Sequence, residues 1–297
     1  MHSRTLVWLC LTLFFVACTK GKEELQPGDT ATSGAFELLA DETLRPCIDS
    51  LITGFNITTP KGKVTVKYVN ATDALDALIN QKARLVLIAR SLTSKERKIL
   101  ESQKIELTEA EVAQSSIGCI VSRKSISESM SMDELRRLLN YQIVGNHWVP
   151  HHRVSTSYLS STESVLDSIF GREKYQEGEI VRFRTTDSVF DSVVKDTGAI
   201  GFVNISWIHD RIRKGDSSFR ILKISSGGGE PIMLHPAYIL QGLYPLQSRI
   251  CAYTTEVPNT LPRGFLAYAM AAEGQRVFLN YDLIPKTQIL KLVPSQK

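Results

Sequence analysis

The stretch RLVLIARSLTSKE, residues 84–96, carries the clearest fold signal in the chain. After Arg84 it runs apolar to Ala89, as a strand buried on both faces does. Thr93-Ser-Lys-Glu96 is then a capping box, in which a Thr and a Glu three residues later satisfy the first free N–H groups of a helix. A buried strand leading into a helix predicts an α/β protein.

The same alternation continues on both sides of this stretch. Apolar residues at three- and four-residue steps predict a helix from Ala40 to Phe55, and alternating Val and Tyr predict a strand at Lys63–Val69. Capping boxes at Ser131–Glu134 and Ser160–Glu163 open two further helices. The remaining predicted elements are helices at Asp73–Gln81 and Leu261–Phe278 and strands at Ile117–Val121, Gly198–Val203 and Ile250–Tyr253. This order indicates largely parallel sheets covered by helices.

Composition narrows the class of protein. Of 297 residues, 43% are apolar and 22% charged, with 35 Lys and Arg against 31 Asp and Glu. These values are typical of a soluble globular protein and exclude a disordered chain, a coiled coil and a multi-span membrane protein. The small positive excess forms no Lys/Arg block, so no nucleic-acid partner is expected.

The N-terminus has the pattern of a bacterial lipoprotein signal. An apolar run, Thr5–Ala17, is too short to span a bilayer and ends in the lipobox-like Phe15-Val-Ala-Cys18. We expect a signal peptide at 1–17, lipid on Cys18 and a polar tether at 18–33. The alternative is an ordinary secretory signal with Cys18 incidental. The first interpretation places the protein in the periplasm or on the cell surface, lipid-anchored to a bacterial membrane.

The remaining cysteines and histidines indicate neither a disulfide framework nor a metal site. Once Cys10 is removed with the signal and Cys18 is lipidated, Cys47, Cys119 and Cys251 remain, an odd number that argues against a full disulfide framework. Cys119 and Cys251 lie in apolar, strand-like runs, which indicates buried thiols. His147 and His151 have a helical spacing, but Pro150 breaks a helix there. We therefore expect no metal and no cofactor.

Six segments in order resemble phosphate-type substrate-binding proteins of ABC transporters. Together they cover Leu39–Val293, and the opening segment is similar to that of a Bacteroidota-type lipoprotein subgroup. The matching segments are Ala40–Phe55, Arg84–Glu96, Ser131–Trp148, Ala199–Val203, Tyr244–Tyr253 and Phe265–Pro285.

The resemblance implies a two-lobe periplasmic binding protein-like fold (type II), an α/β class with mixed sheets flanked by helices and a cleft between the lobes. The first lobe would comprise residues 34–121 and 247–297, and the second residues 122–246. Helix N-termini that point into such a cleft present free N–H groups and a partial positive charge, which favour anions.

Three loops would then supply the ligand contacts. The acidic residues of the first have an alternative role as helix caps. Arg90, in the second, can clamp an oxyanion or form an ion pair. The third begins a helix, where amides and hydroxyls hold an oxyanion unless the capping box engages them. The predicted ligand-binding residues are Asp41, Glu42, Thr43, Arg90, Ser91, Ser160, Ser161 and Thr162.

The chain departs from phosphate-specific members of the family at these loops. Thr156 stands where an Arg commonly precedes the third loop, and Arg90 stands near the place of an Asp. In phosphate-specific members the first loop usually has hydrogen-bond donors only, whereas here it contains the carboxylates of Asp41 and Glu42. A carboxylate accepts a proton from protonated phosphate but repels fully ionised sulfate.

Two classes of function remain. The first is a monomeric receptor that binds phosphate or another small anion and delivers it to an ABC permease. The second is a sensor or interaction lipoprotein that kept the fold without transport. An enzyme with Ser160 or Ser161 as nucleophile is not expected, because no G-x-S-x-G elbow is present.

Overall fold

The computed structural model describes residues 29–139, 153–171 and 180–287. The predicted signal peptide, Cys18, all but the end of the tether and the segment His147–His152 lie outside these residues. Within them, no helix is long and apolar enough to cross a membrane.

The main sheet runs through the whole molecule in the order β2-β1-β3-β11-β4-β8-β6-β7. On one side β1 pairs in parallel with β2 and β3, and on the other β6 pairs in parallel with β7 and β8. Its strands are β1 (Gly34–Asp41), β2 (Gly62–Val69), β3 (Leu85–Ile88), β4 (Thr108–Ser122), β6 (Arg153–Ser157), β7 (Ile180–Phe183), β8 (Ala199–Asn204) and β11 (Gln247–Thr254).

Short strands complete the sheet structure. Two of them, β9 (Phe219–Ile221) and β12 (Ile284–Pro285), pair with β4. The other two, β5 (Ser129–Ser131) and β10 (Lys223–Ser225), pair with each other.

Helices cover both faces of the sheet. Directly before the first of them, α1, the chain makes a 3-10 turn, η1 (Glu42–Leu44). They are α1 (Arg45–Thr58), α2 (Ala71–Ile79), α3 (Ser94–Ser102), α4 (Met132–Leu139), α5 (Thr162–Phe170), α6 (Thr186–Lys195), α7 (Ile205–Arg213), α8 (Pro236–Leu240), α9 (Leu261–Met270) and α10 (Ala272–Leu279).

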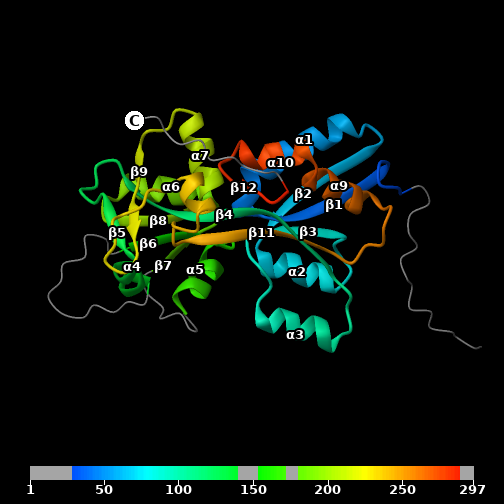
Figure 1. Ribbon diagram of the computed structural model, residues 1–297, viewed down its shortest axis with the longest axis horizontal. Helices are drawn as coiled ribbons and strands as arrows, with labels where there is room; N and C mark the ends of the chain where they lie inside the picture. The colour runs from blue at the N-terminus through cyan, green and yellow to red at the C-terminus, as the bar shows by residue number, and fades with distance from the viewer. Residues whose placement is uncertain (1–28, 140–152, 172–179, 288–297) are drawn as a thin grey trace, which may run out of the picture.

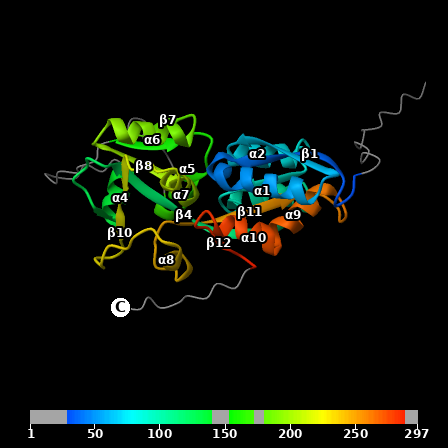
Figure 2. The ribbon, with the colours of Figure 1, turned by 90° about the horizontal axis from the view of Figure 1, so that it is seen from above.

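These elements form two halves joined by antiparallel strands. Helices α1, α2, α3 and α9 gather around β1, β2 and β3, whereas α4, α5 and α6 gather around β6, β7 and β8 (Figure 1). From above, β4, β11 and β12 lie between the halves (Figure 2). The first part of β4 pairs with β11 and residues 117–121 pair with β8. The mixed α/β, two-lobe fold is confirmed, and the lobe boundaries at 121 and 247 stay predictions.

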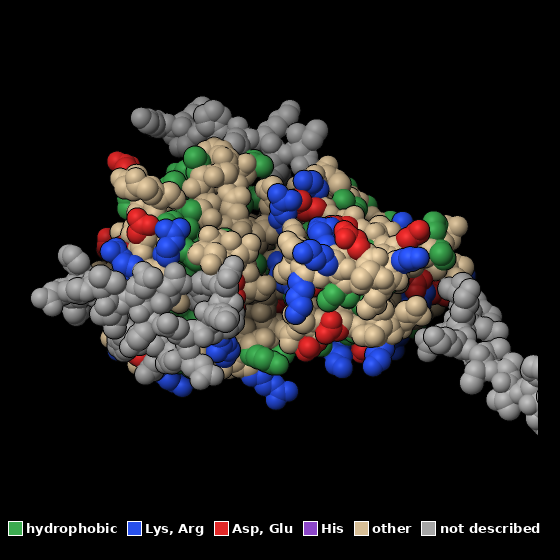
Figure 3. Space-filling view, turned by 90° about the horizontal axis from the view of Figure 1, so that it is seen from below, with side chains coloured by type: hydrophobic (Ala, Val, Ile, Leu, Met, Phe, Trp, Pro, Cys, Tyr) green, Lys and Arg blue, Asp and Glu red, His purple; other side chains and the backbone are tan. Residues whose placement is uncertain are grey.

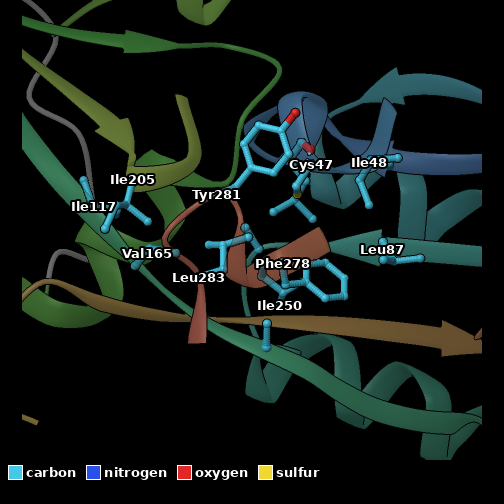
Figure 4. Close-up of a cluster of buried hydrophobic side chains, with 14 of the residues drawn as sticks. Cys47, Ile48, Leu87, Ile117, Val165, Ile205, Ile250, Phe278, Tyr281 and Leu283 are labelled. Atoms are coloured by element: carbon cyan, nitrogen blue, oxygen red, sulfur yellow. Dashed lines mark hydrogen bonds between the residues drawn. The ribbon is translucent and has the colours of Figure 1, made fainter. Parts of the chain in front are cut away.

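The hydrophobic core begins with the apolar face of α1. Cys47, Ile48 and Phe55 are buried on it, and Figure 4 shows Cys47 and Ile48 in the cluster that includes Leu87 and Phe278. The Cys47 thiol donates to the Leu44 carbonyl at 3.1 Å, and burial raises its pKa. Cys47, Cys119 and Cys251 are all buried and free, as predicted for Cys119 and Cys251.

Two predicted helices differ from those of the structure. Ala40 lies in β1, and the helix starts only after the 3-10 turn. The closing helix breaks at Ala271, whose backbone is extended (ψ 171°), and continues as α10. The break lets Gly274 approach the preceding turn so closely that a Cβ there would lie 2.3 Å from the Tyr268 carbonyl oxygen.

Two of the three capping boxes are confirmed. At α3 the Thr93 hydroxyl accepts from the Glu96 amide and the Glu96 carboxylate accepts from the Thr93 amide; Ser131 and Glu134 do the same at α4. The prediction of a capping box at α5 is wrong. The N-cap is Ser161, one residue later than predicted, and the Ser160 hydroxyl accepts from the Thr162 amide at 3.3 Å. The Glu163 carboxylate accepts from Arg182 at 2.6 Å.

Candidate functional site

The candidate site lies where parallel strands of both lobes end. Asp41 is the last residue of β1, and Ala89 follows the end of the neighbouring β3. In the second lobe Ser157 ends β6, and Thr186 begins α6 shortly after β7. Ligands of open α/β sheets bind outside the carboxyl ends of their strands, so this is the edge at which a ligand site is expected.

The Asp41 carboxylate bridges the two lobes. From its own lobe it accepts hydrogen bonds from the amides of Thr43 (2.9 Å) and Ala89 (3.3 Å). From the second lobe it accepts the amide of Ser161, 3.1 Å from both carboxylate oxygens, and the Ser161 hydroxyl. The side chain is fully buried. Burial raises its pKa, and the hydrogen bonds from Ser161 and Thr43 act in the opposite direction.

The Glu42 carboxylate makes a second bridge beside the first. It accepts the Thr186 amide (3.2 Å), the Thr186 hydroxyl (2.6 Å) and the Ser157 hydroxyl (3.2 Å), all from the second lobe. The pKa of Glu42 is raised to about 7. Burial is the main cause and the charge of Asp41 adds to it, whereas the Thr186 hydrogen bonds and the charge of Arg45 lower the pKa.

Main-chain atoms of the same loop also contact the second lobe. The Glu42 amide donates to the Leu159 carbonyl at 3.2 Å, and the Trp207 indole N–H donates to the Glu42 carbonyl at 3.2 Å. The Ser161 amide also lies 3.1 Å from the Thr43 hydroxyl oxygen. The predicted first and third loops therefore meet directly.

The first and third loops hold six of the predicted ligand-binding residues. Asp41, Glu42, Thr43, Ser161 and Thr162 are buried, and Ser160 is half-buried with its hydroxyl donating to the Ser157 carbonyl. Their assignment to a ligand stays a prediction.

The second loop has a different arrangement. The Arg90 guanidinium is buried and makes a two-point ion pair with Glu96, at 2.6 and 2.8 Å. Glu96 also caps α3, so Arg90 holds the start of this helix, which favours the ion-pair alternative over ligand contact. Ser91 is exposed. From this loop, the group that reaches Asp41 is the amide of Ala89.

Sequence reasoning missed three residues of the site: Ser157, Thr186 and Trp207. One signal was available. Thr185 accepts from the Ser188 amide, so the polar run Thr185-Thr-Asp-Ser188 before buried Val189 is a helix start like the three that were identified. Ser157 and Trp207 carry no local signal, because only the fold brings them to Glu42.

A groove adjoins the site on the outside. It has a volume of ≈ 800 Å³ and lies between the start of α1 and helix α7, with residues of both lobes in its walls. Its wall includes Trp207, bonded to Glu42, and Asp187, the neighbour of Thr186. Another face also shows a furrow between the halves, with charges of both signs along it (Figure 3).

The chemistry of the site is that of an oxyanion cradle. Its donors are backbone amides and hydroxyls, including the amides at the starts of α5 and α6, where the helix dipoles favour negative charge. In this structure the acceptors are the chain's own carboxylates. Among the described residues, no group of three or more His, Cys, Asp or Glu side chains could hold a metal ion.

Comparison with known proteins gives a family and a fold. A family model described as "PBP superfamily domain" matches residues 25–273. No curated protein has a sequence that matches the chain.

Solved structures are similar over most of the chain. One, described as a phosphate ABC transporter substrate-binding protein from Clostridium perfringens with bound phosphate, has a TM-score of 0.71 and 15% identity, over 85% of this chain and 100% of that one. An ABC-type phosphate transport receptor from Vibrio cholerae gives 0.64 and 16%, over 85% and 100%. The regulatory domain of CcmR from Synechocystis, in complex with 2-PG, gives 0.55 and 14%, over 81% and 98%.

Proposed function

Because the chain belongs to the PBP superfamily, whose domain model matches residues 25–273, we propose that it is a lipid-anchored extracytoplasmic solute-binding protein for a small anion. Phosphate or a related oxyanion would bind between the lobes and be released unchanged, with no bond made or broken. Cys18 would carry the lipid, and a monomeric receptor would deliver its ligand to an ABC permease.

One observation carries this proposal: donors of both lobes converge on oxyanion oxygens. Ser161 of the second lobe and Thr43 and Ala89 of the first all donate to one carboxylate. Carboxylate and phosphate oxygens accept the same hydrogen bonds. The phosphate-bound relative from Clostridium perfringens supports the choice of ligand class.

The two acidic residues, Asp41 and Glu42, affect the binding of an anion. The pKa of Glu42 is about 7. Once protonated, the Glu42 carboxyl group can donate a hydrogen bond to an anion, and it no longer carries a negative charge that would repel the anion. Protonated phosphate can itself donate to a carboxylate, whereas sulfate cannot. Binding of phosphate should therefore strengthen as the pH falls through 7.

A thermal-shift panel on the protein purified without phosphate tests the proposal. The anions are phosphate, sulfate, molybdate, phosphonates and small carboxylates, at pH 5.5 and 7.5. A ligand at a hundred times its Kd adds about 2.7 kcal/mol, a shift of roughly 5–10 °C for a domain of this size. We expect a phosphate shift, larger at pH 5.5. A flat panel at both pH values would refute the receptor.

A second candidate, a sensor or interaction lipoprotein without transport, is favoured by a specific observation. Asp41 and Glu42 already satisfy the donors of the cleft, so the closed form is complete without a solute. The resemblance to a regulatory domain supports the same direction. Capture of a protein partner by the wild type, combined with a flat anion panel, would select this function.

A further inference from the structure

The cleft contains two distinct oxyanion positions. We define the Asp41 position by its donors, the amides of Thr43, Ala89 and Ser161 and the Ser161 hydroxyl. We define the Glu42 position by the amide and hydroxyl of Thr186 and the hydroxyl of Ser157. Each position has a geometry in which several donors aim at one carboxylate.

The two positions link the lobes. In each, the acid comes from the first lobe, and a helix start in the second lobe supplies an amide, that of Ser161 for α5 and that of Thr186 for α6. Glu42 is also fixed through its main chain to Leu159 and Trp207. In a two-lobe binding protein, a ligand that bonds both lobes favours the closed form, and here side chains of the chain supply those bonds.

We propose that Asp41 and Glu42 are internal occupants of these two positions, which close the lobes without a solute and set the affinity of the cleft for outside anions. The inference deepens the proposed function and rests on it for the class of ligand. An anion from solution must compete with two tethered carboxylates for the same donors, and it meets their negative charge if they stay nearby. The two acids therefore determine specificity.

Neither acid has the environment of a residue kept for stability alone. A buried carboxylate costs free energy unless its hydrogen bonds compensate for the lost hydration. Asp41 and Glu42 are both fully buried at consecutive positions, and the charge of Asp41 raises the cost of ionising Glu42. A cap needs only one short acceptor such as Ser. The pair fits the role of an anion substitute better.

The test compares the wild type with the double variant Asp41→Ser/Glu42→Ser. Serine keeps a small capping side chain and removes both charges. The matched control is Glu37→Ser, an exposed acid on the same strand. Isothermal titration with sodium sulfate and sodium phosphate at pH 7.5 measures affinity, and small-angle scattering of the purified full chain, with and without sulfate, measures closure.

We expect the wild type and the control to be compact with or without sulfate. The double variant should have a larger radius of gyration that returns to the wild-type value with sulfate. Its sulfate affinity should be at least about tenfold higher than that of the wild type. A folded double variant that stays compact and binds no more tightly overturns the inference, as does a wild type that opens when anions are removed.

Two further comparisons keep the result decisive. If circular dichroism shows that the double variant is unfolded, the single variants Asp41→Ser and Glu42→Ser take its place, and a folded single variant with unchanged sulfate affinity counts against the inference. The proposed function fails separately, when no anion of the panel shifts the wild type at either pH. The internal-occupant inference then still stands if the double variant gains sulfate binding.

Discussion

The Ser161 amide lies 3.1 Å from both carboxylate oxygens of Asp41, although 120 residues separate the two in the chain. This contact brings the start of α5 in one lobe to the end of β1 in the other. Burial disfavours the ionised form of Asp41, and the hydrogen bonds from Ser161 act in the opposite direction. The Asp41 carboxylate is thereby a hydrogen-bond acceptor at the junction of the two lobes. The behaviour of the protein should therefore depend on these two residues.

Replacing Ser161 with Ala should destabilise the protein by about 1–3 kcal/mol, because the buried carboxyl group of Asp41 loses its hydroxyl donor. Urea unfolding at pH 7.5 measures the change. Ser102→Ala is the control, since that hydroxyl donates to the Ile99 carbonyl at the exposed end of α3. Equal effects of the two substitutions would contradict the importance of the Asp41 contact.

Stability should fall as the pH rises from about 4.5 to about 7. The folded state raises the pKa of Glu42 from 4.5 to about 7, so between these values the folded state holds a proton that the unfolded state has released. The full difference is roughly 3 kcal/mol, present below pH 4.5 and lost above pH 7. Asp41 contributes in the same direction.

Urea unfolding of the wild type and Glu42→Gln at several pH values between 4.5 and 8 tests this dependence. The Gln variant should lose the Glu42 part of the slope and keep the part that Asp41 causes. An identical slope in both proteins would show that Glu42 titrates normally.

Arg90→Ala should destabilise the protein by about 3 kcal/mol and leave anion affinity unchanged, because Arg90 pairs with Glu96 at the start of α3. The matched control is Arg97→Ala, which breaks a more exposed pair with Glu109 and should cost at most about 1 kcal/mol. Urea unfolding and anion titration on the same samples separate the roles. A folded Arg90→Ala protein with weakened phosphate binding would restore Arg90 to the ligand site.

The break between α9 and α10 predicts two opposite effects. Ala271 begins α10 without a side-chain cap, so Ala271→Ser should stabilise the protein by about 1 kcal/mol. Gly274→Ala should destabilise it by about 1–3 kcal/mol, because the added Cβ would overlap the Tyr268 carbonyl and Ala269. Thermal unfolding measures both, and a neutral Gly274→Ala would show that the two helices separate easily.

The fold was largely predictable where local pattern decides it. The apolar run after Arg84 and the capping box at Thr93 gave β3 and α3 directly. β6 was missed because its residues are mostly polar, and β7 because four residues are too few to show a period. The pairing of β6 with both β7 and β8 is a property of the sheet. The break at Ala271 was also hidden, since the helical pattern continues through it.

The candidate site was predictable in its location and not in its bonding. The family resemblance brought the Asp41 and Ser161 loops to one cleft, where the structure also has them. That the acids accept the amides of the opposite lobe depends on side-chain positions across the lobe junction, which no spacing encodes. For the same reason Thr186, more than 140 residues from Glu42, was not identified.

The strand β4 gives the two lobes a common folding unit. Residues 108–116 pair with β11, residues 117–121 pair with β8, and β9 pairs with its last three residues, so one unbroken strand contributes to the hydrogen-bond ladders of both halves. A segment excised at residues 122–246 would leave β8 without this neighbour and expose the unpaired edge of a buried strand. Neither half is therefore an autonomous module, and we expect the chain to unfold in one cooperative transition rather than lobe by lobe.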